Sequence, residues 1–340
     1  MLPRVLNYTS ERRTIRRMRH HSFGWIAALL TTFVTAGVVR AQPSRLQPEF
    51  ATGTVKANGL TFTYIEAGRG PLVLALHGFP DHPRTFRYQM RALAAAGYHV
   101  VAPFERGYAP TDVPPDGSYE SVNLAADALA LIDALGDGKP AVLLGHDWGA
   151  VAAQSAAAAA PQKVAKLITI AIPPGFSQSL ISNPAQQRRS WYMYFFNMPF
   201  AEAAVQRDSL AFVDRLWTEW SPAWKYSHAE LDSVKAVMRR PGSLHAALNY
   251  YRESLGAHTP AHTPMLDSLR KLTGNTISVP TLYLVGAQDG CIGVEVSEGA
   301  EKKFTGPFDK KIVAGAGHFL HQEKPEEVTR MILTFLGPAR

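Results

Sequence analysis

Cysteine is almost absent from this sequence, because Cys291 is the only one among 340 residues. A single cysteine excludes an intrachain disulfide and a metal site built from several thiolates. We interpret Cys291 as a small buried residue. The hydrophobic content of 46% is enough for a sizeable core, so a chain of this length can fold without covalent cross-links.

A basic surface is also missing once the N-terminus is set aside. The full chain has a formal net charge of +7. Residues 1–41 hold seven arginines and one glutamate, so the rest of the chain carries 28 basic and 27 acidic residues, a net charge of +1. The sequence therefore leaves no basic patch for nucleic acid, and we expect no binding to it.

The N-terminus has the features of a targeting segment. An arginine-rich stretch precedes the apolar run 23–39, and Val39 and Ala41 match the small-x-small cleavage pattern. We predict that residues 1–41 are a signal peptide, and that the mature protein is periplasmic or secreted without stable membrane association. The alternative is a membrane anchor formed by residues 23–39, although this run is slightly short for a span.

Strand-like and helix-like segments alternate over most of the remaining chain. The runs "PLVLALHG" (71–78), "PAVLLG" (140–145) and "VPTLYLVG" (279–286) are continuously apolar, as in buried strands. A hairpin is expected around Asn58-Gly59. Segments with helical periodicity follow the apolar runs, which predicts an α/β fold with a mostly parallel central sheet flanked by helices.

This alternation stops after Pro173-Pro174. Residues 173–275 are rich in aromatic side chains, have helical periodicity and contain no strand-like run. We predict an inserted helical cap at 173–275, and a core formed by residues 50–172 and 276–340. Ligands of open α/β sheets bind beyond the carboxyl ends of the strands, so the cap is expected to lie over that edge.

Three candidate catalytic residues each follow a predicted strand. Asp147 lies in the motif G-H-D-W-G, Asp289 follows the strand at 279–286, and His318 lies in the glycine-rich loop after the last strand. The order nucleophile, acid, histidine is that of the α/β-hydrolase arrangement. Each residue alone has an ordinary structural explanation as a helix cap, a turn residue or a loop histidine. Their joint placement favours a catalytic triad.

A fourth motif, H-G-F-P at 77–80, follows the strand at 71–78. Gly145 and Gly149 let the turn at residue 147 pass close to neighbouring backbone, so that the side chain stands exposed. The N–H of Trp148 opens the next helix, and the N–H of Phe79 can supply a second donor. We expect these two amides to form an oxyanion hole.

With these motifs the sequence resembles the epoxide hydrolase and haloalkane dehalogenase branch of the α/β-hydrolase superfamily. The resemblance covers roughly residues 50–340 and is carried by H-G-F-P, G-H-D-W-G, Asp289 and G-H at 317–318. It implies that the Asp147 carboxylate displaces a leaving group at saturated carbon and forms an alkyl-enzyme ester. Water, activated by His318 with support from Asp289, then hydrolyses this ester.

The resemblance also suggests what stabilises the leaving group. Epoxide hydrolases of this branch typically use two cap tyrosines. The stretch "WYMYFFN" aligns Tyr192 with the first, and "LNYYRES" aligns Tyr251 with the second. Tyr194 and Tyr250 are the alternatives if the alignment slips. The other aromatic residues of the cap are expected to pack in the core.

A haloalkane dehalogenase with the same triad is the alternative activity. Its halide would need N–H donors, which the indoles of Trp148 and Trp191 could provide. Dehalogenases often carry an asparagine where this sequence has Phe79, whose side chain cannot donate, and this favours the epoxide branch. We expect His77, Pro80, Trp148 and Trp191 to line the substrate pocket.

Two other classes of function are less well supported. A plain esterase would need a serine at the elbow, where the sequence has Asp147. A non-catalytic binding module would not need a complete triad. The sequence contains no motif for a metal or nucleotide cofactor, since "GRG" at 68–70 lacks the Lys-Ser/Thr of a phosphate loop. We expect a small apolar substrate, with water as co-substrate.

Overall fold

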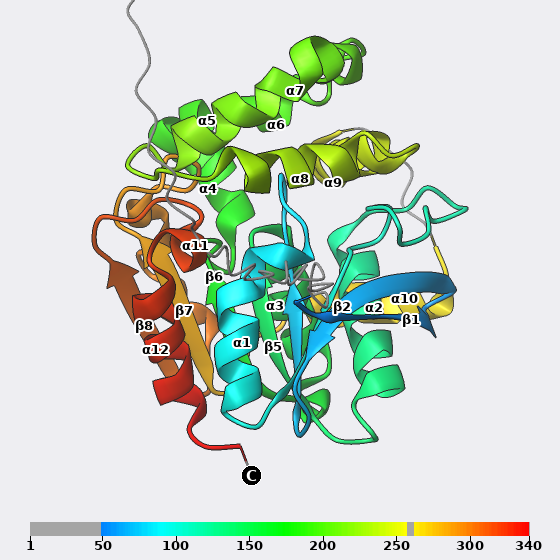
Figure 1. The fold of residues 1–340 in the computed structure, drawn as a ribbon, viewed down its shortest axis with the longest axis vertical. Helices are drawn as coiled ribbons and strands as arrows, with labels where there is room; N and C mark the ends of the chain where they lie inside the picture. Colours follow the sequence, from blue (N-terminus) through cyan, green and yellow to red (C-terminus); the bar gives the residue numbers. More distant parts are fainter. Residues whose placement is uncertain (1–48, 257–261, 340) are drawn as a thin grey trace, which may run out of the picture. The chain divides into compact units, whose positions relative to one another are not determined.

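The computed structural model describes residues 49–256 and 262–339, and in these residues eight strands form one sheet (Figure 1). The strand order is β1-β2-β4-β3-β5-β6-β7-β8. The strands from β4 to β8 in this order are parallel to one another, and β2 pairs antiparallel with both of its neighbours, β1 and β4. This is the mostly parallel sheet that the sequence predicts. The predicted signal peptide, residues 1–41, lies outside the described residues.

The two antiparallel strands form the expected hairpin. β1 (Ala51–Ala57) pairs with β2 (Leu60–Ala67), and the turn between them has positive φ angles at Asn58 (44°) and Gly59 (77°). Asn and Gly tolerate this left-handed conformation better than other residues do, which is why Asn-Gly is typical of tight hairpins. This tight turn therefore sets which residues of β1 and β2 pair with each other at the edge of the sheet.

The central strands are rich in apolar residues because helices cover both faces of the sheet. Every residue of β3, β5 and β7 is buried, whereas β8 at the sheet edge is largely exposed. The strands are β3 (Leu72–Leu76), β4 (His99–Pro103), β5 (Ala141–His146), β6 (Val164–Ile170), β7 (Thr281–Gly286) and β8 (Phe308–Val313).

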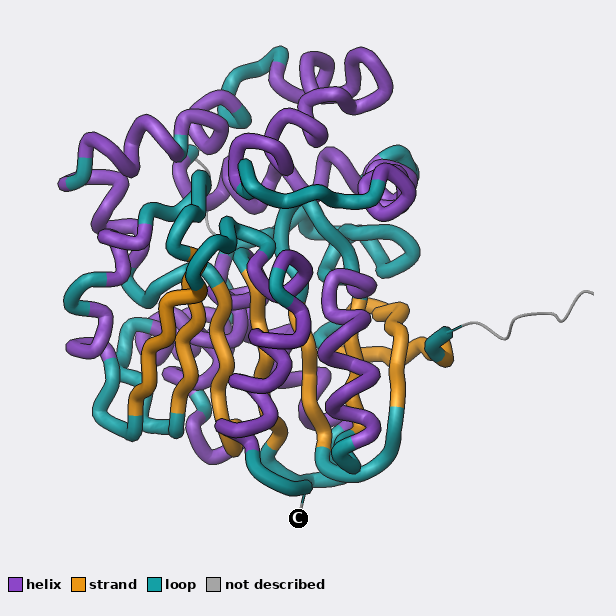
Figure 2. The backbone as a smooth tube through the Cα atoms, turned by 60° about the vertical axis from the view of Figure 1, so that its left-hand side comes forward, coloured by secondary structure: helices purple, strands orange, loops and turns teal. Residues whose placement is uncertain are grey.

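Successive side chains of each strand enter two different cores. Leu74 and Leu143 pack with α2 (Ser121–Leu135) and α3 (Trp148–Ala159) on one face. On the other face, alternate strand residues pack with α1 (Arg87–Ala95) and α12 (Pro325–Leu336). Figure 2 shows the strands as one twisted layer between helices.

The segment between β6 and β7 is helical in the residues that are described. Figure 1 shows α5 to α9 gathered at one end of the sheet, in green to yellow. The helices of this segment are α4 (Phe176–Ser182), α5 (Pro184–Arg189), α6 (Trp191–Phe195), α7 (Ala201–Trp220), α8 (His228–Met238), α9 (Ser243–Leu255) and α10 (Pro264–Thr273).

The last of these helices differs from the prediction that residues 173–275 all belong to the cap. α10 packs against α2 and α3 of the core. Its buried Leu266 joins a small apolar cluster with Val122 and Ala126 of α2. The apolar face of α10 is therefore buried against the core. Helical periodicity in a sequence predicts an apolar face, but it does not predict which element that face packs against.

The remaining elements are short. None of the helices in residues 49–256 and 262–339 is long and apolar enough to cross a bilayer. The short helices are η1 (Pro83–Phe86), η2 (Pro161–Lys163), η3 (Val294–Ser297), η4 (Ala300–Lys303) and α11 (Leu320–Glu323).

A buried ion pair connects the loop after β4 to α2. Asp127 accepts hydrogen bonds from Arg106 Nε at 2.5 Å and Nη2 at 2.8 Å, and Arg106 Nη1 also donates to the Ser118 carbonyl. Asn58 Nδ2 donates to the same carboxylate at 2.7 Å. Both charged side chains are almost completely buried, so each depends on the other for solvation.

We therefore expect Asp127→Ala to lower the free energy of unfolding by about 3–5 kcal/mol, because it leaves the Arg106 charge buried without a counterion. Urea denaturation followed by circular dichroism measures this loss. The matched control is Asp133→Ala on the same helix, which removes an exposed ion pair with Lys163 and should cost less than about 1 kcal/mol. Equal losses in the two variants would contradict a structural role of the buried pair.

Candidate active site

Asp147 stands at a sharp turn between β5 and α3. Its backbone has φ 51° and ψ −119°, a sparsely populated conformation for a residue with a side chain. The flanking glycines make the turn possible: a Cβ on Gly145 would lie 2.2 Å from the Gly149 carbonyl oxygen, and one on Gly149 only 1.9 Å from that of Leu76. This is the close backbone approach predicted from the motif.

The two oxygens of the Asp147 carboxylate have different surroundings. Oδ1 accepts a hydrogen bond from the Phe79 N–H at 2.8 Å. Oδ2 lies 3.6 Å from Nε2 of His318. Trp148 is the first residue of α3, so its N–H is one of those that a helix leaves without an intrahelical partner. One oxygen is thus held by the H-G-F-P loop, and the other faces the histidine.

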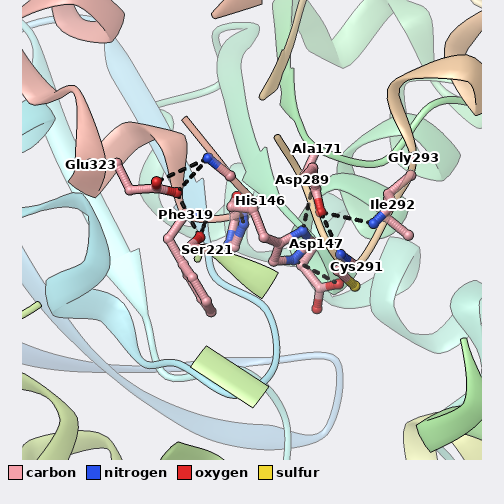
Figure 3. Close-up of polar contacts among 12 residues, drawn as sticks. His146, Asp147, Ala171, Ser221, Asp289, Cys291, Ile292, Gly293, Phe319 and Glu323 are labelled. Carbon is pink, nitrogen blue, oxygen red and sulfur yellow. Dashed lines mark hydrogen bonds and ion pairs between the residues drawn. The ribbon is translucent and has the colours of Figure 1, made fainter. Parts of the chain in front are cut away.

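Asp289 and His318 form a buried pair beside this carboxylate. Nδ1 of His318 lies 2.9 Å from Asp289 Oδ2. Oδ1 of Asp289 accepts two backbone hydrogen bonds, from the N–H of Cys291 at 2.7 Å and of Ile292 at 2.8 Å (Figure 3). These bonds fix the orientation of the Asp289 carboxylate toward the imidazole.

The loop that carries His318 is bonded to the end of cap helix α7. The N–H of His318 donates to the Trp220 carbonyl at 3.0 Å. The next contact is made through Glu323, which accepts hydrogen bonds from the Gly317 N–H at 2.9 Å and from Ser221 Oγ at 2.6 Å (Figure 3). The cap therefore helps to hold the histidine in place.

The pKa of His318 reflects this crowded site. Burial alone lowers the pKa of the imidazole, but the neighbouring Cys291, Asp289 and Asp147 side chains outweigh burial and raise the pKa well above its usual value. The acidic surroundings of the ring therefore favour its protonated form.

A cavity of about 550 Å³ adjoins the Asp147 side chain. Its volume is in the range of sites that bind small molecules. Aromatic and aliphatic side chains from the core and the cap form much of its wall. They include Trp148, Ile172, Phe176, Leu180, Tyr192, Met193, Tyr251 and Ile292.

Two tyrosines of the cap line this cavity together with Asp147. Burial raises the pKa of both Tyr192 and Tyr251 well above the usual value, so both hydroxyls keep their protons and can donate them. The Tyr251 hydroxyl has no hydrogen-bond partner among the described residues. The Tyr192 hydroxyl lies 3.3 Å from Cys291 Sγ. Both tyrosines can therefore present a proton to a ligand.

The two alternative tyrosines lie elsewhere. The Tyr250 hydroxyl donates to the Arg106 backbone carbonyl at 2.9 Å, inside the core. The Tyr194 side chain is exposed. Tyr192 therefore lines the cavity and its alternative Tyr194 does not, and Tyr251 lines it and its alternative Tyr250 does not.

Three expected pocket residues are not among those that line this cavity. His77 is fully buried. Its Nδ1 lies 2.9 Å from the Gly78 carbonyl oxygen, and its Nε2 accepts a hydrogen bond from the N–H of Glu105 in the loop after β4. The Pro80 carbonyl accepts a hydrogen bond from the Trp217 indole. The structure thus shows the H-G-F-P loop using these groups in contacts with the core and the cap, and their place in the substrate pocket stays a prediction.

Trp191 is the third expected pocket residue that does not line this cavity. Its indole packs against Phe195 and Phe212, with the Arg215 guanidinium over the ring at 4.5 Å. The neighbouring Tyr192 points into the cavity instead, because consecutive helical residues lie about 100° apart around the axis. Of the four expected pocket residues, only Trp148 lines the cavity.

Sequence reasoning did not place three residues at the site: Ser221, Glu323 and Cys291. Ser221 and Glu323 are far apart in the chain, and only the packing of the cap brings them together. Cys291 is fully buried, as predicted, but it lies beside the triad and not in a distant part of the core. Its position two residues after Asp289 was the available signal.

Comparison with known proteins agrees with this geometry. A family model described as the alpha/beta hydrolase fold matches residues 71–325. Human epoxide hydrolase 4 is 34% identical over 293 residues, which cover 83% of this chain and 77% of the relative. Epoxide hydrolase A of Mycobacterium tuberculosis is 32% identical over 321 residues and covers 83% of this chain and 96% of the relative.

Solved structures give the same result. A Bacillus megaterium epoxide hydrolase in complex with an inhibitor superposes with a TM-score of 0.71 at 28% identity, covering 84% of this chain and 99% of that one. Epoxide hydrolase A from Mycobacterium thermoresistibile has a TM-score of 0.70 at 29% identity, with 84% and 98% covered. The chain therefore belongs to the α/β-hydrolase fold family and, within it, to the epoxide hydrolases.

Proposed function

We propose that this protein hydrolyses epoxides to vicinal diols with Asp147 as the nucleophile, His318 and Asp289 as the base pair, and Tyr251 and Tyr192 as proton donors. The observation that carries this proposal is the position of the Asp147 carboxylate. Its Oδ1 accepts a hydrogen bond from the Phe79 N–H, and the Asp147 side chain lines the same cavity as the buried Tyr192 and Tyr251.

In the first step, Asp147 attacks one epoxide carbon. Oδ2 is the attacking oxygen, because Oδ1 is already engaged by the Phe79 N–H. The new carbon–oxygen bond forms as the strained ring C–O bond breaks, and the ring oxygen leaves as an alkoxide that stays attached to the substrate. Tyr251, with Tyr192, donates a proton to this oxygen.

In the second step, water hydrolyses the resulting ester. Esterification removes the negative charge of Asp147, one of the groups that raise the pKa of His318, so this pKa falls. A protonated ring then releases its proton to solvent, acts as a base, and takes a proton back from solvent when the carboxylate is restored. Nε2 then takes a proton from a water molecule that attacks the ester carbonyl carbon. Asp289 stabilises the imidazolium, and the proton finally returns to the tyrosinate.

The oxyanion hole acts in this second step. Negative charge develops on Oδ1, which already accepts the Phe79 N–H at 2.8 Å. The Trp148 N–H at the start of α3 is the proposed second donor. Each well-placed donor stabilises such an intermediate by roughly 3–4 kcal/mol. Collapse of the intermediate releases the diol and restores the carboxylate.

An activity panel on the full chain tests the proposed reaction. It pairs aryl and alkyl epoxides with chloro-, bromo- and iodoalkanes, and it scores diol and free halide separately. We expect diol from epoxides, with little or no halide. Halide without diol would place the protein in the dehalogenase branch, where Trp148 would be the halide donor that lines the cavity.

We expect Tyr251→Phe to slow epoxide opening by about 10- to 100-fold, because it removes a proton donor and leaves Tyr192 to act alone. The measurement is the initial rate of diol formation on the best substrate of the panel. Tyr250→Phe is the matched control, since that hydroxyl bonds only a backbone carbonyl among the described contacts. A silent Tyr251→Phe, or an equal loss in both variants, would refute the role of Tyr251.

We further propose that residues 1–41 direct export and are then removed. The arginine-rich start, the apolar run and the small residues before Gln42 support this. N-terminal sequencing of protein from the periplasm or medium of a bacterial host tests it. A mature chain that begins at Gln42 is the expected result, whereas an intact N-terminus in the membrane fraction would indicate an anchor.

A further inference from the structure

Two consecutive backbone amides of the loop that carries His318 are bonded to the end of cap helix α7. The His318 N–H donates to the Trp220 carbonyl at 3.0 Å. The N–H of the next residue, Phe319, donates to Ser221 Oγ at 3.2 Å (Figure 3). Trp220 is the last residue of α7 and Ser221 is its C-cap. The backbone from which the imidazole projects is thus fixed to the cap.

Glu323 connects the same two segments a second time. Its Oε1 accepts a hydrogen bond from the Ser221 hydroxyl at 2.6 Å, and its Oε2 accepts one from the Gly317 N–H at 2.9 Å. Ser221 Oγ therefore donates to the carboxylate and accepts from the Phe319 N–H. Because Ser221 is buried, the loss of its hydroxyl would leave polar groups without a partner that water readily replaces.

The same helix end also contacts the loop of the catalytic acid. The Trp220 carbonyl accepts a second hydrogen bond, from the Gly290 N–H at 3.0 Å, and Gly290 directly follows Asp289. A carbonyl oxygen has two lone pairs and can accept both bonds. One backbone oxygen of the cap therefore joins the loops of Asp289 and His318.

Two glycines allow α7 to come this close. A Cβ on Gly290 would lie 2.0 Å from the Glu219 carbonyl oxygen, and one on Gly317 would lie 2.6 Å from the Trp220 carbonyl oxygen. Neither glycine has a positive φ angle. The approach of the helix, and not the local backbone conformation, therefore requires glycine at both positions. Each glycine is next in sequence to a residue of the proposed triad, so both catalytic loops are shaped to receive the end of α7.

We propose that Ser221 and Glu323 are positioning residues for His318, and that they serve the second step of the reaction selectively. This proposal rests on the proposed function, in which only ester hydrolysis uses the histidine as a base. In the described residues, the side-chain hydrogen bonds of Ser221 and Glu323 go to the histidine loop and to each other. Neither side chain is therefore bonded to the nucleophile or to the tyrosines that act in the first step.

A single turnover with enzyme in excess over epoxide measures the two steps separately. The reaction is quenched at successive times, and intact-protein mass spectrometry follows the ester. We expect Ser221→Ala to slow ester hydrolysis by about 10- to 100-fold, because the imidazole is no longer held in place. The rate of ester formation should stay within about twofold of the unmodified protein, since this step does not use the histidine. The ester should therefore accumulate.

Thr218→Val is the matched control, because it removes a hydroxyl from the same helix. Thr218 is exposed, and its Oγ1 donates to the Asp214 carbonyl and lies 2.9 Å from the Tyr226 hydroxyl. Both rates should be unchanged in this variant. Equal slowing of the two steps by Ser221→Ala would show a merely structural role and would overturn the proposal, as would unchanged hydrolysis.

Two variants of Glu323 separate hydrogen bonding from charge. Glu323→Gln keeps the length of the side chain and an oxygen that can accept from Ser221, whereas Glu323→Asp keeps the charge on a shorter side chain. Positioning predicts faster ester hydrolysis in the Gln variant than in the Asp variant. Glu326→Gln, at an exposed position of α12, is the control and should match the unmodified protein. Hydrolysis in the Asp variant that is as fast as in the Gln variant, or faster, would overturn the role of Glu323.

Proton NMR gives a readout that does not depend on activity. His318 Nδ1 lies 2.9 Å from Asp289 Oδ2, and a proton in such a buried pair resonates far downfield, where His318→Gln identifies it by removing it. We expect Ser221→Ala to shift or broaden this signal and Thr218→Val to leave it unchanged. An unchanged signal in Ser221→Ala would overturn the positioning of the imidazole. If neither the unmodified protein nor His318→Gln forms an ester, the proposed function fails, and the NMR comparison still decides whether Ser221 positions the ring.

Discussion

Replacing His318 by Gln is expected to stop the reaction at the alkyl ester of Asp147. The first step needs only the carboxylate and the tyrosine donors, so the epoxide still adds to the protein. The second step needs a base at the position of Nε2, which glutamine does not provide. We expect turnover to fall by about 10²- to 10⁴-fold, the usual contribution of a general base.

Intact-protein mass spectrometry after mixing with substrate checks this result. The protein mass should rise by the mass of the whole epoxide, because no atom leaves in the addition. A haloalkane would add its alkyl group only, and halide would be released. Peptide mapping should place the ester on Asp147.

His321→Gln is the matched control for this variant. His321 is a second buried histidine close to the site, and its Nε2 lies 2.6 Å from Thr85 Oγ1 instead of facing the carboxylate. This variant should not accumulate the ester. An unmodified mass in His318→Gln, or equal trapping in both variants, would contradict the role of His318.

Asp147→Asn is expected to have the largest effect on turnover, a loss of at least about 10⁴-fold. An amide is a much poorer nucleophile than a carboxylate, and the elbow offers no other group that could form the ester. Diol formation under substrate saturation measures the loss. Near-normal circular dichroism should show that the fold is kept, since the substitution changes one atom.

A double variant makes this prediction sharper. Asp147→Asn combined with His318→Gln should not acquire the mass of the epoxide, because the atom that forms the ester is gone. Any adduct that survives in the double variant would mean that the covalent bond forms at another residue. Substantial diol formation by Asp147→Asn alone would mean that water attacks the epoxide directly.

The parts of the site that the sequence predicted are those that depend on short stretches of chain. The turn at Asp147 follows from the two glycines that flank this residue after a buried strand, and the structure has the expected close backbone approach. The proximity of Asp289 and His318 follows from the order of the motifs, because parallel strands end at one edge of the sheet. The fold class follows from the same alternation of strands and helices.

The parts that the sequence did not predict depend on the packing of the cap. Whether Trp191 or Tyr192 faces the cavity depends on the rotation of one short helix, and both are aromatic. The contact between Ser221 and Glu323 joins residues 102 positions apart, and neither belongs to a recognisable motif. The place of Cys291 beside the triad follows from the path of the loop after Asp289, which composition alone does not determine.

A single turnover in H₂¹⁸O tests the central claim, that the reaction proceeds through an ester of Asp147, most directly. Enzyme in excess over epoxide is mixed in labelled water, and the diol and the peptide that contains Asp147 are analysed by mass spectrometry. We predict unlabelled diol from this first turnover and one ¹⁸O atom in the Asp147 carboxylate, because water attacks the carbonyl carbon and the diol carries away an original carboxylate oxygen. Labelled diol with an unlabelled Asp147 would show direct attack of water on the epoxide and would contradict the covalent mechanism.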